Sequence, residues 1–301
     1  MHGVVVIDKP RGMSSANVVE RVRRGLGVER AGHGGTLDPI ATGVLAICVG
    51  AGTKLAQFLL ADNKAYEAEG VLGVQTDTLD RTGRIVDERT VDVTREALLA
   101  ALASHRGEQT QIPPMYSAIK QGGVRLYHRA RAGEEVVRAP RTIRIDHLEL
   151  LAFEPPRFRI AVECGKGTYI RSLVADLGSA VGAGAHLAEL RRTRSGRFTL
   201  AQAIALDRLA EGRLIPPERA TDLPSVIVAA DLVPQVFNGV QLPVEAFGAE
   251  GLARFQLLDQ AGTLLAVAHP QAGRTVYDRV FPELALVPPP VLRGRAGRHP
   301  E

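Results

Sequence analysis

Apolar residues occur along the chain in short runs, and several of these runs have the spacing of β-strands. Residues 3–7 read GVVVI and stop at Asp8, which predicts a short buried strand. Between 158 and 164 apolar residues alternate with polar or small ones, the pattern of a strand with one buried face. Residues 66–72 also predict a strand. Together these segments indicate a central sheet.

Other stretches have helical spacing. Ser14 or Ser15 can cap a helix in which Val18, Val19 and Val22 lie on one face. The same reasoning predicts three further helices, over 53–60, 94–104 and from about 168 to 181. Strands and helices alternate without a regular strand-helix-strand repeat. The pattern therefore predicts an α+β fold with a mixed sheet.

A proline-marked segment over 214–224 is the best domain boundary. Beyond it, short apolar runs such as 255–259 and 264–268 lie between glycines and prolines, which predicts a small β-barrel. Three consecutive prolines and a basic end predict disorder at the end of the chain. The expected parts are a large domain, a small barrel and a disordered tail, over 1–222, 223–290 and 291–301.

The charged residues give weak evidence about partners. The net charge of the 301 residues is +4, and Lys occurs at only five of the 37 basic positions. Arg binds phosphate with two parallel hydrogen bonds and stacks on bases, so this bias suits an RNA partner. A GC-rich genome produces the same bias without any such partner. Charge alone therefore does not define the function.

Several classes of protein are disfavoured. Cys48 and Cys164 each lie in an apolar stretch, with no spacing typical of a zinc site and no disulfide framework. The first apolar run is too short for a signal peptide, and no run is long enough to span a bilayer. We expect a cytoplasmic protein that binds no metal and no membrane.

The most unusual stretch is a predicted glycine-dense loop over 31–43, whose residues 32–43 read GHGGTLDPIATG. Its glycines allow the backbone to approach a ligand closely, and Pro39 stiffens the turn that presents the Asp38 carboxylate. A plain glycine-rich turn with a capping aspartate has the same features. The residues alone leave both interpretations open.

Three other segments carry candidate functional side chains. Tyr66 in NKAY (63–66) could stack on an extruded base, although a strand tyrosine is more often half in the core. Tyr169 and Arg171 in GKGTYIRSL (165–173) could face one cleft, although an arginine in a first helical turn is more often solvated. The basic, glycine-flanked segment 111–141 is either a mobile arm that closes over RNA or a surface hairpin.

These segments, in this order over residues 3–210, resemble the motifs of the bacterial tRNA pseudouridine-55 synthases, the TruB family. The resemblance implies that Asp38 is the catalytic nucleophile and that Arg171 pairs with it. It also implies that Tyr66 is the active-site tyrosine and that Tyr169 lines the pocket.

Three further residues gain a role only from this resemblance. His33 would help to hold the RNA open, and Leu190, in GAHLAELRR (184–192), would form an apolar wall of the uracil pocket. Lys9 lies in the segment IDKPRGMSS (7–15), which resembles the family's first motif, and would be an RNA-binding residue.

The resemblance further implies a pseudouridine synthase catalytic domain that isomerises uridine 55 in the tRNA T-arm without any cofactor. The small C-terminal barrel would be a PUA-like RNA-binding domain. Separately, we expect a monomer. The sequence does not decide whether Asp38 attacks the sugar, attacks C6 of the base or abstracts a sugar proton.

Three alternative functions stay open at this point. A guide-RNA-dependent pseudouridine synthase shares the Asp38 motif, although the arm over 111–141 favours the stand-alone form. A non-catalytic tRNA-folding chaperone could use the same surface, or folding could be an added activity. A metal-dependent phosphohydrolase could be built on three aspartates and a histidine, namely His33, Asp38, Asp77 and Asp80. Aspartates such as Asp77 and Asp80 more commonly cap loops than bind a metal.

Overall fold

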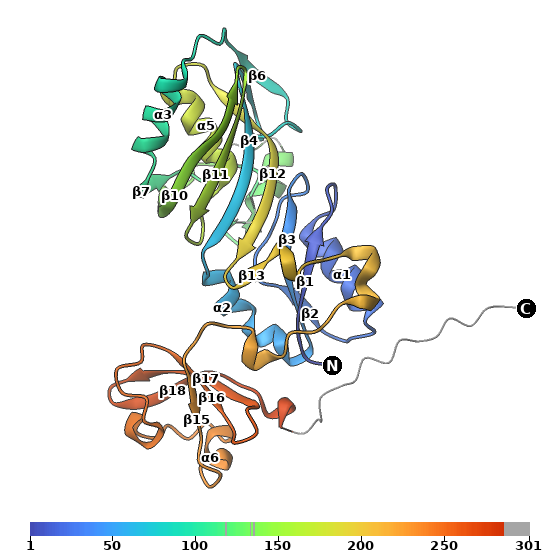
Figure 1. The fold of residues 1–301 in the computed structure, drawn as a ribbon, viewed down its shortest axis with the longest axis vertical. Coiled ribbons are helices and arrows are strands. Elements are labelled where there is room, and N and C mark those ends of the chain that lie inside the picture. The colour runs from blue at the N-terminus through green and yellow to red at the C-terminus, as the bar shows by residue number, and fades with distance from the viewer. Residues whose placement is uncertain (118, 133, 135, 286–301) are drawn as a thin grey trace, which may run out of the picture. The chain divides into compact units, whose positions relative to one another are not determined.

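The computed structural model describes residues 1–285 except 118, 133 and 135 (Figure 1). The chain forms two compact units. Unit 1 contains Met1–Asp38, Leu45–Leu60 and the described residues from Gly196 onward. Unit 2 contains Pro39–Val44 and Ala61–Ser195. The glycine-rich segment is thus divided, because its aspartate ends one stretch of unit 1 and its proline begins unit 2.

Unit 2 is built on a mixed sheet. The pairing of β12 with β3 is parallel, and all other pairings of the sheet in this unit are antiparallel. Buried apolar residues of β11 alternate with exposed or half-buried ones, which confirms the expected strand with one buried face. The strand order is β3 (Thr42–Val49), β12 (Ala185–Ser195), β4 (Lys64–Leu72), β11 (Arg157–Cys164), β10 (Arg141–Glu154) and β7 (Gly107–Gln111).

Two helices of unit 2, α3 (Arg95–Ser104) and α5 (Ile170–Ala180), lie side by side against this sheet (Figure 1). Thr94 caps α3 by accepting a hydrogen bond from the Ala97 N–H group. Tyr169 is the N-cap residue of α5 and makes no side-chain cap. Both predicted helices are confirmed to within two residues of their expected ends.

The smaller elements of unit 2 are two hairpins and a short helix. The hairpins are formed by β5 with β6 and by β8 with β9. The second hairpin and the helix lie within the segment 111–141, which is the predicted arm. The bounds are β5 (Val74–Thr76), β6 (Ile85–Glu88), β8 (Lys120–Gln121), β9 (Val124–Arg125) and α4 (Leu126–Arg131).

In unit 1, the buried strand predicted at the N-terminus is β1 (Gly3–Lys9), followed by α1 (Ser15–Gly25). Ser14 caps α1 by accepting a hydrogen bond from the Asn17 N–H group, as predicted. The sheet order in this unit is β14-β1-β3, with β2 also paired to β3. The other elements of this part are β2 (Ala31–His33), α2 (Ala56–Ala61), β13 (Phe198–Thr199) and β14 (Ile204–Ala205).

Two local expectations need correction. The glycine-rich stretch 31–43 is not a loop throughout, because Ala31–His33 forms β2 antiparallel to β3. The helix expected over 53–60 is a 3-10 helix, Gly50–Leu55, that continues into α2. Gly50 has φ +56°, and a Cβ there would clash with the Met1 carbonyl oxygen and the His2 ring, which explains a glycine at the end of β3.

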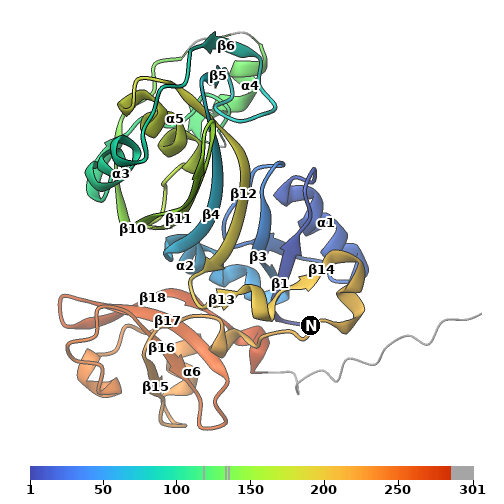
Figure 2. The same ribbon diagram turned by 45° about the horizontal axis from the view of Figure 1, so that its top comes forward.

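The small C-terminal sheet predicted after the proline-marked boundary is present, with α6 (Val233–Phe237) against it (Figure 2). It has its own buried core, in which Phe255 and Leu257 are fully buried. A closed PUA-like barrel stays a prediction, and the expected disordered tail at 291–301 lies outside the described residues. The strands are β15 (Ser225–Ile227), β16 (Phe255–Leu258), β17 (Leu264–Gln271) and β18 (Arg274–Val280).

Candidate active site

The residue directly before Asp38 is held by two hydrogen bonds between its backbone and one serine side chain. The Leu37 N–H group donates to the Ser15 hydroxyl at 2.8 Å, and the same hydroxyl donates to the Leu37 carbonyl at 2.9 Å. Both Ser15 and Leu37 are buried. The first residue of α1 therefore holds the peptide groups directly before Asp38, whose own side chain is half-buried. This link explains the place of Ser15 in the first motif of the sequence.

His33 and Lys9 lie in the same unit. His33 is half-buried in β2 opposite Ile47, and its Nδ1 atom accepts a long hydrogen bond from the Gly35 N–H group, at 3.4 Å. Lys9 is 0% exposed and donates from Nζ to the Pro10 carbonyl at 2.8 Å. The RNA contacts expected of both residues stay predictions. For Lys9 the structure describes a fully buried ammonium group.

Tyr66 and Leu190 lie on one face of the unit 2 sheet. In the β4–β12 ladder Tyr66 is opposite Arg192, and Leu190 is opposite Ala68. Residues two apart on a strand, and residues directly opposite each other, point to the same face. Tyr66 is half-buried and Leu190 is buried. The structure therefore brings these two predicted pocket residues together as diagonal neighbours.

The helices cover this same face. Glu67 and Glu69 point to the opposite side of β4, where they pair with Arg159 and Arg157. Since that side carries exposed ion pairs, α5, which contacts β4 and β12, packs on the Tyr66 side. The start of α5 carries the other two candidates of this unit, Tyr169 and Arg171.

The Arg171 guanidinium is buried and lies close to three oxygen atoms. It is 3% exposed, and it donates to the Thr78 carbonyl at 2.8 Å and to the Tyr116 carbonyl at 2.7 Å. Its Nε atom lies 3.8 Å from a carboxylate oxygen of Asp80. The solvated arginine that the bare sequence favours is thus wrong. The pairing of Arg171 with Asp38 stays a prediction.

Asp80 is itself fixed by its own loop. One carboxylate oxygen accepts hydrogen bonds from the Thr82 N–H group and hydroxyl and from the Thr78 hydroxyl. Asp77 accepts from the Arg84 N–H group at 2.9 Å. Both aspartates therefore cap the loop, as the sequence analysis favoured over a metal pair. Among the described residues, no group of three or more potential metal-binding side chains of His, Cys, Asp and Glu is present.

Tyr169 is held by residues that the sequence did not single out. Its backbone N–H group donates to the Gln111 side chain at 2.8 Å, and its carbonyl accepts from the same amide at 3.1 Å. The Arg141 guanidinium lies over the Tyr169 ring, 4.5 Å from its centre. Pattern and spacing did not predict the contact of Asp80 with Arg171 or the contacts of Gln111 and Arg141 with Tyr169.

Buried positive charge also lies beside Tyr66 on the sheet. Arg192 is 1% exposed and donates from Nε to the Val44 carbonyl at 2.7 Å. Lys64, at the start of β4, is buried and donates to the Asp62 carbonyl. Burial lowers the pKa of Lys64 to about 8. Both buried cations are thus bonded to backbone carbonyls.

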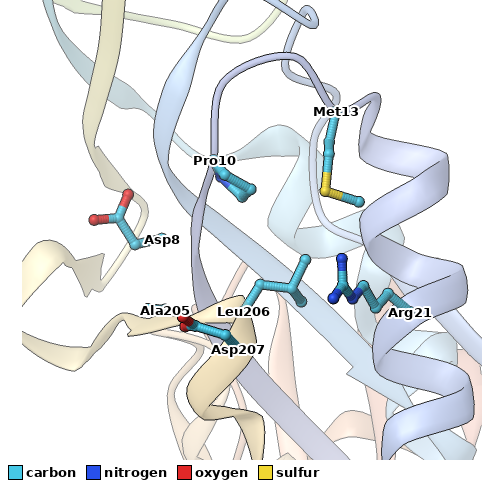
Figure 3. A pocket seen from close by; sticks show the side chains of 7 residues that line it. All are labelled: Asp8, Pro10, Met13, Arg21, Ala205, Leu206 and Asp207. Atoms are coloured by element: carbon cyan, nitrogen blue, oxygen red, sulfur yellow. The ribbon is translucent and has the colours of Figure 1, made fainter.

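Unit 1 contains a cavity of about 330 Å³ next to the first sequence motif (Figure 3). Asp8, Pro10 and Met13 of that motif line it, with Arg21 from α1. The cavity holds none of the candidate catalytic residues. In the part of the chain that the structure describes, no helix is both long and apolar enough to cross a membrane.

The fold and this arrangement define the class of protein. A crystal structure of a Cbf5-Nop10-Gar1 complex matches 93% of this chain and 84% of the solved chain, with a TM-score of 0.71 and 28% identity. The structure of an H/ACA RNP bound to a substrate RNA containing 2'-deoxyuridine matches the same shares, with a TM-score of 0.70 and 26% identity. The chain has the fold of a pseudouridine synthase.

Sequence comparison defines the family. The model described as TruB family pseudouridylate synthase (N terminal domain) matches residues 23–170. The tRNA pseudouridylate synthase B C-terminal domain matches 171–232. The tRNA pseudouridine synthase B of Stutzerimonas stutzeri is 53% identical over 207 residues, 69% of this chain and 68% of the relative. That of Symbiobacterium thermophilum is 49% identical over 245 residues, 79% and 82% of the two chains. The chain belongs to the TruB family, which confirms the resemblance found in the sequence.

Proposed function

We propose that this protein isomerises uridine 55 in the T-loop of tRNA to pseudouridine, with Asp38 as nucleophile. The observation that carries the proposal is the coverage of the two TruB models, which together include Asp38, Tyr66, Tyr169, Arg171 and Leu190. Relatives named tRNA pseudouridine synthase B, about half identical to this chain, support the same substrate.

The reaction breaks the bond between C1′ and N1 of uracil, rotates the base and joins C1′ to C5. It needs a nucleophile, a fixed positive charge, a stacking surface and walls that retain the free base. Asp38 is the nucleophile, and Arg171 pairs with its carboxylate and fixes its direction. Tyr66 stacks on the base, while Tyr169 and Leu190 line the pocket. No redox change or energy source enters this scheme, so we expect no cofactor.

The target uridine must leave the T-loop stack before it can react, and base flipping costs a few kcal/mol. His33 fills the space that the base leaves, and the segment 111–141 closes over the RNA hairpin. Phosphate contacts by Lys and Arg side chains offset the cost of flipping. The segment 223–290 adds RNA contacts outside the pocket. A chain truncated after Leu223 should then bind tRNA with a flatter salt dependence.

The stand-alone enzyme is favoured over the guide-RNA-dependent form. The tRNA-specific relatives are 49–53% identical to this chain, whereas the Cbf5 complex has 28% identity. A chaperone activity is compatible with the same surface as an added function. A pure chaperone would have no use for a buried, multiply bonded arginine such as Arg171 beside a pocket tyrosine.

The test is to incubate the purified protein with unmodified tRNA transcript, with no nucleotide or other cofactor added, and to map the positions of pseudouridine. We expect modification at uridine 55 alone, and none in a transcript with cytidine at that position. Activity should persist in EDTA when RNA folding is controlled. Absence of pseudouridine, together with an EDTA-sensitive and Mg²⁺-restored cleavage of phosphate esters, would instead support the phosphohydrolase. A monomeric state and a cytoplasmic location stay predictions.

A further inference from the structure

The segment 112–140 leaves and re-enters the unit 2 sheet at one pair of residues. Gln111 is the last residue of β7, Arg141 is the first residue of β10, and the two are opposite each other in the antiparallel ladder. This pair is therefore the base of the arm. Both of its side chains reach Tyr169, the residue directly before α5.

Gln111 binds the backbone of Tyr169 with both ends of its amide. The Oε1 atom accepts from the Tyr169 N–H group at 2.8 Å, and the Nε2 group donates to the Tyr169 carbonyl at 3.1 Å. Gln111 is only 3% exposed, so water competes little for these bonds. Two bonds to one residue fix its position and also its orientation.

Arg141 contacts the ring of the same tyrosine. Its guanidinium carbon lies 4.5 Å from the ring centre, within the range of a cation–π interaction. The Nε and Nη2 atoms are buried and have no hydrogen-bond partner among the described residues. Buried donors without partners are unfavourable, so the guanidinium is not held there by hydrogen bonds from those two atoms. The cation–π contact places the guanidinium against Tyr169, the residue directly before α5.

The arm is tied to the next residues of α5 as well. Arg171 donates to the Tyr116 carbonyl at 2.7 Å, and the Ser172 hydroxyl donates to the Ile112 carbonyl at 3.2 Å. Tyr169, Arg171 and Ser172 thus all take partners from the arm or its base. Movement of the arm would be transmitted to the residues that form one side of the pocket.

We propose that Gln111 and Arg141 are positioning residues that set the place and ring direction of Tyr169, so that the arm and the uracil pocket adopt their active geometry together. This proposal rests on the proposed function, because it requires Tyr169 to line the pocket. Neither residue needs to touch the substrate. A displacement of about 1 Å in a positioned group can lower a rate about 100-fold.

The experiment measures single-turnover pseudouridine formation at saturating tRNA, and tRNA affinity separately. We expect Gln111→Ala and Arg141→Ala each to lower the rate at least about 10-fold while affinity changes less than about threefold. Gln111→Glu, which keeps the acceptor but not the donor, should fall between the wild type and Gln111→Ala. Arg144→Ala is the matched control, since Arg144 is an exposed residue of the same strand, paired with Asp146.

A double-mutant cycle separates positioning from a general loss of stability. In a Tyr169→Leu background, where the ring is absent, Arg141→Ala should lower the rate no further. An equal fall in both backgrounds would overturn the proposal. A second result would also overturn it: Arg141→Ala reacts at the normal rate but binds tRNA more weakly. In that case the slope of log affinity against log salt concentration would fall by about one, which identifies a phosphate contact. If the wild type modifies tRNA and all variants behave like Arg144→Ala, this inference alone fails.

Discussion

The Nε atom of Arg171 lies 3.8 Å from the Asp80 carboxylate, and the two side chains are 3% and 7% exposed. A charge pair this deeply buried stabilises the structure only if its remaining atoms are also hydrogen-bonded. That condition holds here, because Asp80 is bonded to Thr78 and Thr82, and Arg171 to two backbone carbonyls. The loop that follows β5 therefore fixes the direction of the arginine.

Removal of the Asp80 charge tests this relationship. Asp80→Asn keeps the shape of the side chain but leaves Arg171 without this counter-charge. We expect turnover to fall about 10- to 100-fold and the free energy of unfolding to fall by up to about 3–5 kcal/mol. Single-turnover kinetics and urea denaturation measure the two effects. Asp77→Asn is the control, since Asp77 pairs with an exposed arginine, Arg84, and should change turnover little. Equal effects of both variants would contradict the account.

Substitution of Arg171 tests the proposed pairing with Asp38. Arg171→Lys keeps the charge, but a single ammonium group cannot reproduce the planar donors that reach Thr78 and Tyr116. We expect turnover to fall strongly and tRNA affinity to change little. Arg171→Ala removes the guanidinium altogether, so we expect a larger fall in turnover than in Arg171→Lys, again with little change in tRNA affinity. Weakened tRNA binding with unchanged single-turnover chemistry would make Arg171 a phosphate contact instead.

Lys64 gives a prediction about stability and pH. Its pKa in the folded protein is lowered by burial to about 8, whereas in the unfolded chain it is near its usual value. Between these two pKa values the unfolded chain binds the proton and the folded chain does not, so the Lys64 contribution makes stability rise with pH. Below about pH 8 both states are protonated and this contribution is constant.

The measurement is urea denaturation of wild type and Lys64→Met at pH 7, 8, 9 and 10. The difference in unfolding free energy, wild type minus variant, should be flat from pH 7 to 8. It should then rise by about 1–3 kcal/mol towards pH 10. Lys166→Met, at an exposed lysine, should give no such rise. Parallel curves for wild type and Lys64→Met would contradict the lowered pKa.

The sequence predicted β1, β4 and β11 but missed β3, a continuous apolar run, and the irregular strands β10 and β12. The alternating run of β11 and the capped helices α1 and α3 follow from local pattern. No strand was expected over β10 or β12. Each has two shifts of register in its pairing, the first between Ile145 and His147 in β10 and between Leu187 and Glu189 in β12. Such bulges break the period of two on which strand prediction depends.

For the site, resemblance supplied the residues within motifs, and only the structure supplied their supports. Arg171 takes its partners from Thr78, Asp80 and Tyr116, which are distant from it in the chain. The contacts of Gln111 and Arg141 with Tyr169 likewise depend on the pairing of β7 with β10. No local pattern encodes contacts of this kind. Ser15 is a converse case. The sequence placed it in a motif, and the structure shows that it holds the Leu37 backbone directly before Asp38.

The most direct test of the account is Asp38→Asn, measured by release of tritium from tRNA labelled at C5 of uridine, with tRNA affinity determined in parallel. Joining C1′ to C5 expels the C5 hydrogen, so the release reports the isomerisation itself. The account predicts no detectable release above background, with affinity within about threefold of wild type, because the carboxylate does chemistry and does not hold phosphate. A variant that keeps even a tenth of the wild-type rate would contradict the role of Asp38 as nucleophile.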